Sequence, residues 1–139
     1  MDYGMVLISL KYYCKVLRDM VTFVKYNTMK RVNINDAEVE YTGIDAGGGS
    51  MWNYQNEPFT GILEEFYENG NLIAETECRN GYTYGLQTMY FENGQIEEEY
   101  YEKYNHFYGS FRLWTEDGIL IRHFEFNPDG ELISKIVGE

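Results

Sequence analysis

A turn motif recurs at a fixed interval in this chain. It reads FYENGNL at 66–72 and YFENGQI at 90–96, and the related TEDG places Gly118 another 24 residues after Gly94. Asn-Gly is a strong signal for a tight β-hairpin turn, because both central residues of such a turn have positive φ. A turn that recurs every 24 residues predicts a repeat fold in which each unit is one hairpin.

Three further sets of residues keep the same step. The first is a glycine nine residues before each turn glycine, the second is an aromatic position before the turn, and the third is a Leu or Ile after it. The sets are Gly61, Gly85 and Gly109, then Phe66, Tyr90 and Trp114, then Leu72, Ile96 and Leu120. Each unit is therefore expected to hold two strands joined by an Asx-Gly turn, with a looser connection to the next unit. The pattern predicts a mainly β protein, an antiparallel meander of consecutive hairpins with an N-terminal helix.

The chain divides into three segments. Residues 59–139 hold the hairpin repeats, and residues 32–58 read as a lead-in strand and a Gly-rich loop. Residues 1–31 have apolar side chains at helical spacing and basic ones on the opposite side, which predicts an amphipathic helix. Three interpretations of that helix stay open. It packs on the repeats, it lies on a membrane surface, or it is translated sequence upstream of a start at Met29.

The formal net charge is −12, and it is unevenly distributed. Residues 1–31 carry +4, whereas residues 61–102 carry −9. Affinity for nucleic acid comes largely from clustered Lys and Arg, so the repeats are not expected to bind it. A basic protein partner is the natural complement of an acidic surface, although acidity by itself also serves solubility. The oppositely charged segments also leave a homodimer open.

The sequence contains no pattern that indicates catalysis, a cofactor or a metal. His123-Phe124-Glu125 has the H-x-E order of zinc deaminases, but no P-C-x-x-C follows it. The GGGS segment at 47–50 lacks the Lys-Ser/Thr of a phosphate loop and is expected to be a flexible connection. Cys14 and Cys78 form neither a metal spacing nor a disulfide framework, and free thiols are typical of a reducing cytoplasm. We therefore expect a non-enzymatic, cytoplasmic protein.

Aromatic and acidic residues that differ between units are the better candidates for function. Aromatic side chains stand in the connections just before Gly85 and Gly109, and glutamates are concentrated in the second unit. Rings flanked by acids suit an interface that buries aromatic groups and engages Lys or Arg of a partner. The candidate partner-binding residues are Glu92, Glu97, Glu98, Glu99, Glu102, Tyr82, Tyr84, Phe107 and Tyr108. The structural alternative is that the rings form the core of the repeat and the glutamates a solvated edge.

The segment GILEEFYENGNLIAETECRNGYTYGLQTMYFENGQI (61–96) resembles the variant MORN repeat (membrane occupation and recognition nexus), and the likeness extends over residues 54–134. The lead-in YQNEPFTG resembles the entry to the repeats in bacterial YwqK-type antitoxins, which are immunity partners of secreted polymorphic toxins. The resemblance implies a protein that binds a cognate toxin, such as a nuclease or deaminase domain, and covers its basic active-site cleft. Two alternatives are a scaffolding module that recruits another protein and a peripheral membrane module.

Overall fold

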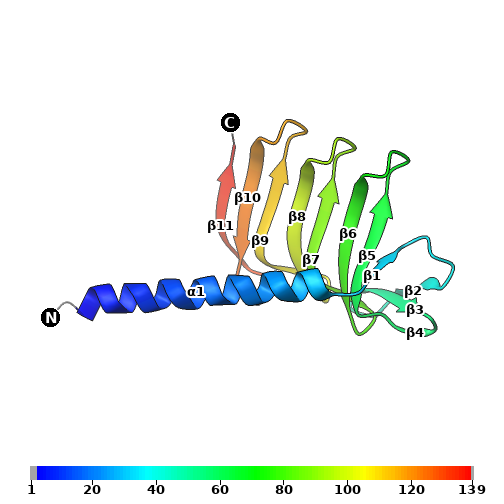
Figure 1. The fold of residues 1–139 in the computed structure, drawn as a ribbon, viewed down its shortest axis with the longest axis horizontal. Coiled ribbons are helices and arrows are strands. Elements are labelled where there is room, and N and C mark those ends of the chain that lie inside the picture. The colour runs from blue at the N-terminus through cyan, green and yellow to red at the C-terminus, as the bar shows by residue number, and fades with distance from the viewer. Residues whose placement is uncertain (1–2, 139) are drawn as a thin grey trace.

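The computed structural model describes residues 3–138 and, within them, the side chains of all but residues 3–11 and 27. One helix, α1 (Tyr3–Thr28), precedes a mainly β body (Figure 1). The strands are β1 (Arg31–Asn33), β2 (Val39–Ile44), β3 (Ser50–Tyr54), β4 (Glu57–Pro58), β5 (Gly61–Phe66), β6 (Leu72–Arg79), β7 (Tyr82–Tyr90), β8 (Ile96–Lys103), β9 (His106–Trp114), β10 (Leu120–Phe126) and β11 (Leu132–Val137).

Strands β5 to β11 form an antiparallel meander in which each strand pairs with the next. The predicted fold class is therefore confirmed. One strand departs from the expected antiparallel order, because β1 runs parallel to β5 at the edge of the sheet. The chain enters that edge directly from α1. There the amide of Ile62 donates to the carbonyl of Lys30 at 2.8 Å, so β1 satisfies an edge that the meander leaves open.

The ENG turns are three-residue loops at one end of the strands, the upper end in Figure 1. In the first of them the amide of Gly70 donates to the Tyr67 carbonyl at 3.0 Å, and the amide of Tyr67 donates to the Asn71 carbonyl at 2.8 Å. Gly70 has a φ of 88°, whereas Asn69 does not have a positive φ. The predicted two-residue geometry with positive φ at both positions was wrong here. These turns are instead the three-residue hairpin type that ends in a left-handed glycine.

True two-residue turns lie at the opposite end of the strands. Both central residues have positive φ in Gln55-Asn56, Asn80-Gly81 and Tyr104-Asn105. The predicted looser connection between units was therefore wrong, and two of these tight turns contain no glycine. Tyr104 has a φ of 48°, which is unfavourable for a bulky side chain. Its ring lies edge-on to the rings of Tyr82 and Tyr84 at 5.9 and 5.8 Å between centroids, contacts that offset the strained backbone.

Side-chain amides join each ENG turn to the next one. Asn69 donates from Nδ2 to the carbonyl of Glu92 at 3.3 Å, and Asn93 donates in the same way to the carbonyl of Glu116 at 3.1 Å. Both bonds span 23 residues, so they repeat with the period of the sequence. The asparagines therefore hold neighbouring units in register.

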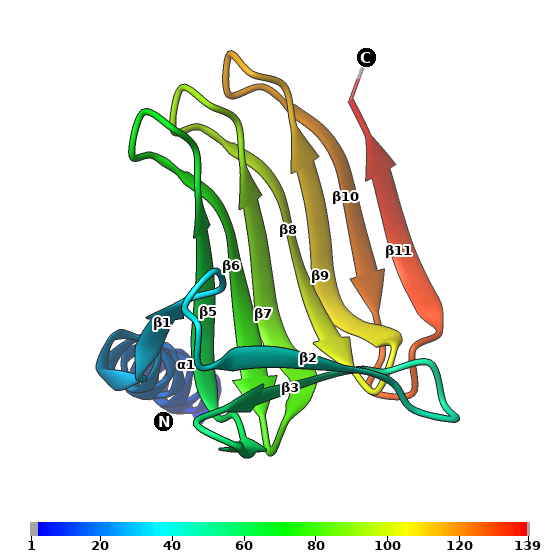
Figure 2. The same ribbon diagram turned by 90° about the vertical axis from the view of Figure 1, so that its right-hand side faces the viewer.

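The hydrophobic core is small and lies at the β5–β6 end of the sheet. It consists of the buried residues Val32, Phe59, Leu63 and Cys78. Trp52 and Tyr54 pack against it from β3, which crosses the sheet together with β2 (Figure 2). Burial and then the nearby charge of Glu77 raise the pKa of the Cys78 thiol to about 12, so this thiol belongs to the core as a neutral group.

Residues 32–58 contain more regular structure than a lead-in strand and a loop. The Gly-rich segment is the turn of the β2–β3 hairpin, and it is an ordered turn rather than the flexible connection we expected. Asp45 accepts hydrogen bonds at Oδ1 from the amides of Gly47 and Gly49 at 2.9 and 2.8 Å. A carboxylate that binds successive amides in this way fixes a turn.

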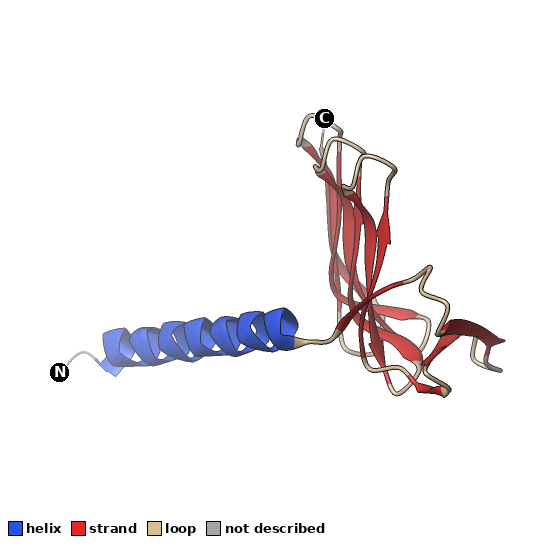
Figure 3. Cartoon of the chain, turned by 45° about the vertical axis from the view of Figure 1, so that its right-hand side comes forward, coloured by secondary structure: helices blue, strands red, loops and turns tan. Residues whose placement is uncertain are grey.

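Helix α1 projects from one face of the sheet, and only its last turns approach the strands (Figure 3). The side chains of residues 12–25 are exposed. The interpretation in which the amphipathic helix packs its apolar side on the repeats therefore does not hold. Within residues 3–138 no helix combines the length and the apolar character needed to span a bilayer.

Substitution of Asn93 by Asp tests the bonds between turns. Asp at this position keeps the side-chain oxygen that accepts from the amide of Gln95 at 2.9 Å but cannot donate to the carbonyl of Glu116. We expect the free energy of unfolding to fall by about 1 kcal/mol in urea denaturation. The matched control is Asp117→Asn in the third turn, which should change stability little. Equal effects of the two substitutions would contradict this role.

Substitution of Gly85 by Ala tests the close contact between neighbouring strands. The Glu77 carboxylate occupies the space that a β-carbon of residue 85 would enter, and it accepts a hydrogen bond from the amide of Leu86 at 2.7 Å. Gly94 has a similar positive φ but open space around it, so Gly94→Ala should cost only the backbone term of about 1–2 kcal/mol. Gly85→Ala should cost about 1 kcal/mol more than Gly94→Ala by thermal denaturation, because the Glu77 carboxylate must move and lose its bond to the Leu86 amide.

Candidate functional site

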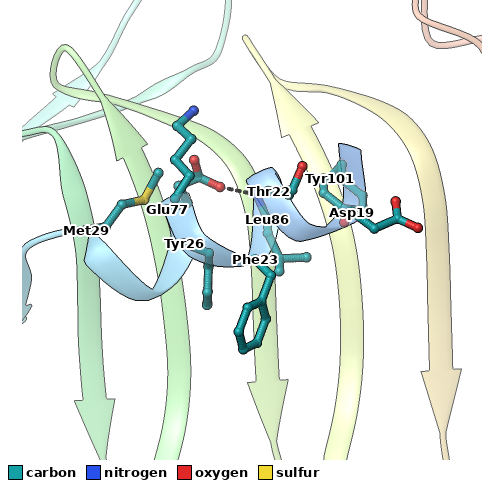
Figure 4. Close-up of a pocket in the computed structure, with 9 residues that line it drawn as sticks. Asp19, Thr22, Phe23, Tyr26, Met29, Glu77, Leu86 and Tyr101 are labelled. Carbon is teal, nitrogen blue, oxygen red and sulfur yellow. Dashed lines mark hydrogen bonds between the residues drawn. The ribbon is translucent and has the colours of Figure 1, made fainter. Parts of the chain in front are cut away.

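The sheet has two faces with different chemistry. Side chains alternate between the faces along each strand, and residues paired across strands share a face. The helix face carries Glu77, Leu86 and Tyr101, which lie beside the end of α1 (Figure 4). The opposite face, which we call the aromatic face, carries Tyr100 and Phe111 as cross-strand partners.

A cluster of five rings occupies the aromatic face over β8, β9 and β10. Phe111 stacks between Tyr100 and Phe124, with 5.8 Å between centroids on each side. Phe107 contacts Phe111 at 5.5 Å and Phe126 at 5.6 Å. The rings remain partly accessible, and Phe107 is the most exposed at 41%. Accessible aromatic rings of this kind are commonly buried in protein interfaces.

Two half-buried glutamates flank the aromatic cluster. Glu102 lies opposite Phe107 in the β8–β9 register, and Glu98 lies opposite Leu113. Desolvation raises the pKa of both carboxyl groups, and the charge of Glu97 adds to the effect at Glu98. Arg122 lies on the same face, but Leu113 separates it from Glu98. Leu113 pairs with Glu98 of β8 on one side and with Arg122 of β10 on the other. Neither glutamate belongs to any ion pair of the described residues, so each would gain from a cation supplied by a partner.

The ion pairs of the described residues, by contrast, lie on the helix face. Arg31 forms ion pairs with Glu75 and, at 3.1 Å, with Glu64. The hydroxyl of Tyr90 donates to the second oxygen of Glu75 at 2.6 Å, and Glu75 is only 7% exposed. Burial is the main cause of the raised pKa of the Tyr90 hydroxyl, followed by its bond to Glu75, so this group stays protonated as the donor. These contacts anchor the chain at the end of α1, which is a structural role.

The structure does not bring the nine sequence-predicted residues together on one surface. Strand alternation separates the consecutive glutamates, because Glu98 faces the aromatic side whereas Glu99 pairs with Arg112 on the helix face at 3.8 Å. The aromatic face holds Glu98, Glu102 and Phe107, and the helix face holds Glu99, Tyr84 and Tyr108. Glu92 lies in a turn, Glu97 lies at the β7–β8 register shift, and Tyr82 packs against Tyr104.

Sequence reasoning missed four of the five rings of the aromatic cluster. They are Tyr100, Phe111, Phe124 and Phe126. Tyr100 and Phe124 are 24 residues apart, so the repeat register marks them as members of one column. The sequence therefore marked these rings in the columns after the turns, whereas our aromatic candidates came from the connections between units.

A groove of about 520 Å³ lies between the end of α1 and the helix face. Asp19, Thr22 and Tyr26 line the groove from the helix, and Leu86 and Tyr101 line it from the sheet (Figure 4). Its lining is mixed, and the Glu77 carboxylate there is occupied by its bond to Leu86. Among the described residues no three His, Cys, Asp or Glu side chains gather as metal ligands.

Two segments of the chain, residues 59–79 and 83–103, match the family described as the MORN repeat variant. These two segments are similar to MORN repeats. The matched segments contain the β5–β6 and β7–β8 hairpins, and β9–β10 continues the same register with Trp114 and Gly118 in the equivalent positions. No curated protein and no solved structure matches the chain. A match to this repeat suggests a repeat-based module for protein interaction.

Substitution of Glu98 by Gln tests whether the half-buried carboxylate on the aromatic face lowers the stability of the fold. A carboxyl group with a raised pKa in the folded protein stabilises the fold only near or below that pKa, and its ionisation destabilises the fold at neutral pH. We therefore expect Glu98→Gln to raise the free energy of unfolding at pH 7 by about 0.5 kcal/mol, since water screens a half-exposed charge. The advantage should shrink as the pH falls towards 4. Glu68→Gln, at an exposed turn position, is the control and should be neutral.

Proposed function

We propose that this protein is an immunity protein that binds a basic bacterial toxin domain with its aromatic face and blocks the active site of that domain. The observation that carries the proposal is the pair of half-buried glutamates beside the aromatic cluster, neither of which belongs to an ion pair of the described residues. The likeness of the repeats and of the lead-in to YwqK-type antitoxins supports the choice of a toxin as the partner.

The proposed mechanism is occlusion. The five rings supply the apolar area at the centre of the interface, where aromatic anchors contribute most of the binding energy. Glu98 and Glu102 then meet Lys or Arg residues that line the toxin's active-site cleft, in the place of an anionic substrate such as nucleic acid. The acidity of residues 61–102 speeds the encounter, because opposite long-range fields raise association rates.

This mechanism requires no catalytic group from the immunity protein. The chain acts as a protein-binding surface in the cytoplasm, where its toxin would otherwise reach its target. A scaffolding role that uses the same aromatic face for another protein is the alternative. The neighbouring gene separates the two functions, since an adjacent secreted toxin favours immunity.

Charge reversal on the aromatic face tests the proposal. We expect Glu98→Lys and Glu102→Lys each to weaken binding to the purified catalytic domain of the adjacent toxin by at least about tenfold in calorimetry at low salt. Phe107→Ala should weaken binding to a similar extent without unfolding the protein, because its ring is the most exposed of the cluster. In cells, the same variants should fail to protect against the co-expressed toxin.

Glu68→Lys is the matched control, because it reverses a charge at an exposed turn position away from the cluster. It should bind like the unaltered protein. An equal loss for Glu68→Lys would mean that overall charge, not the aromatic face, drives binding. No binding to the adjacent toxin by the unaltered protein would overturn immunity and leave the scaffolding role.

A further inference from the structure

A stripe of apolar side chains on α1 faces away from the sheet. Leu17, Met20, Val21 and Val24 line a shallow hollow of about 410 Å³ on the outer side of the helix, and each is between 45% and 67% exposed. The side of the helix that approaches the sheet is mixed, with Asp19 and Thr22 beside Tyr26 (Figure 4). A helix that turns this much apolar surface away from its own domain needs another surface to cover it.

The helix cannot turn this stripe onto its own sheet without disrupting β1. Only Met29 and Lys30 join α1 to β1, and the Lys30 carbonyl accepts a hydrogen bond from the amide of Ile62 at 2.8 Å. Arg31, the next residue, lies over the ring of Tyr26 at 5.2 Å and pairs with Glu75. These contacts fix the rotation of the helix about its axis.

The spacing of the stripe matches a helix pair. Tyr13, Leu17, Met20 and Val24 are separated by four, three and four residues, which is the alternation of core positions in a coiled coil. We propose that α1 pairs with α1 of a second copy of this chain, in antiparallel orientation, and so forms a homodimer. This inference concerns a different surface from the aromatic face and does not depend on the toxin.

The distribution of charge selects the antiparallel orientation. Helix α1 carries four basic residues and one acidic residue, whereas residues 61–102 carry −9. A parallel pair would bring two acidic sheets together at one end. An antiparallel pair separates the two acidic sheets by about the 39 Å length of the helix, which minimises the repulsion between them.

The same charges favour a second copy over a membrane. The basic side of α1 would be attracted to anionic lipid head groups, but the acidic sheet beside it would be repelled by them. A second copy offers an apolar stripe of matching length to cover the first one. Membrane binding is therefore treated as an alternative outcome of the experiment.

Sedimentation equilibrium of the full chain tests the dimer. We expect a dimer whose dissociation constant does not rise with salt, because the seam is apolar and salt screens the repulsion between the two acidic sheets. Leu17→Asp and Met20→Asp should each raise the dissociation constant at least about a hundredfold, since each buries a charge in the seam. Tyr12→Asp is the matched control, because Tyr12 is 71% exposed but lies two turns before Asp19, on the other side of the helix.

Circular dichroism would show whether each variant keeps its helix and sheet. A disulfide test of Val24→Cys in a Cys14→Ser background checks the orientation, because only a parallel pair brings the two residues at position 24 together. A cross-link at that position would overturn the antiparallel arrangement. A monomeric unaltered protein, whether or not it binds mixed phosphatidylcholine and phosphatidylglycerol vesicles, would overturn the dimer, as would a dimer that persists in Leu17→Asp.

Discussion

Pairing of each strand with the next is the interaction on which the rest of this structure depends. Few side chains are buried, and the buried apolar ones gather at the β5–β6 end. The later units consist mainly of half-buried residues, so backbone ladders and cross-strand contacts must supply much of their stability. Each hairpin is held by its neighbours, as expected of a repeat protein whose units are marginal when isolated.

This way of building leaves the side chains of the two faces free to diverge. On the helix face, charged residues form ion pairs with one another. The pair of Arg31 with Glu75, for example, connects the sheet to the segment that follows α1. On the aromatic face, Glu98 and Glu102 lie beside a ring cluster and belong to no ion pair of the described residues. Side chains alternate between the two faces along each strand. One set of alternate positions therefore carries the residues that stabilise the fold, and the other carries the residues proposed for recognition.

The 24-residue step was sufficient to predict the hairpins and their order, because glycine and aromatic positions recur wherever the backbone repeats. It was not sufficient for the turns. Asn-Gly fits both hairpin turn types, and only the bonds of residues such as Gly70 distinguish them. The residues Tyr104-Asn105 did not predict a tight turn, because neither of them is glycine. The turn forms here because the Tyr104 ring packs against its neighbours, a contact that the sequence does not reveal.

The candidate site was harder to predict than the fold for a related reason. Composition identified acidic and aromatic residues, but a single register shift decides which face each one occupies, and such shifts follow from local backbone geometry. The sequence of α1 likewise predicted an amphipathic helix without indicating which of its sides meets the sheet. That choice depends on the short connection through Met29 and Lys30.

The bonds between the ENG turns give the array a direction. The donor is always a side chain of the earlier unit, and the acceptor is a backbone carbonyl of the later one. A hairpin copied by gene duplication therefore brings its own donor and requires no particular side chain from the unit that follows. Asp117 stands at the donor position of the third unit and has no amide hydrogen to offer. In evolutionary terms, insertion before the third unit preserves the linkage, whereas extension beyond it would need a new means of attachment.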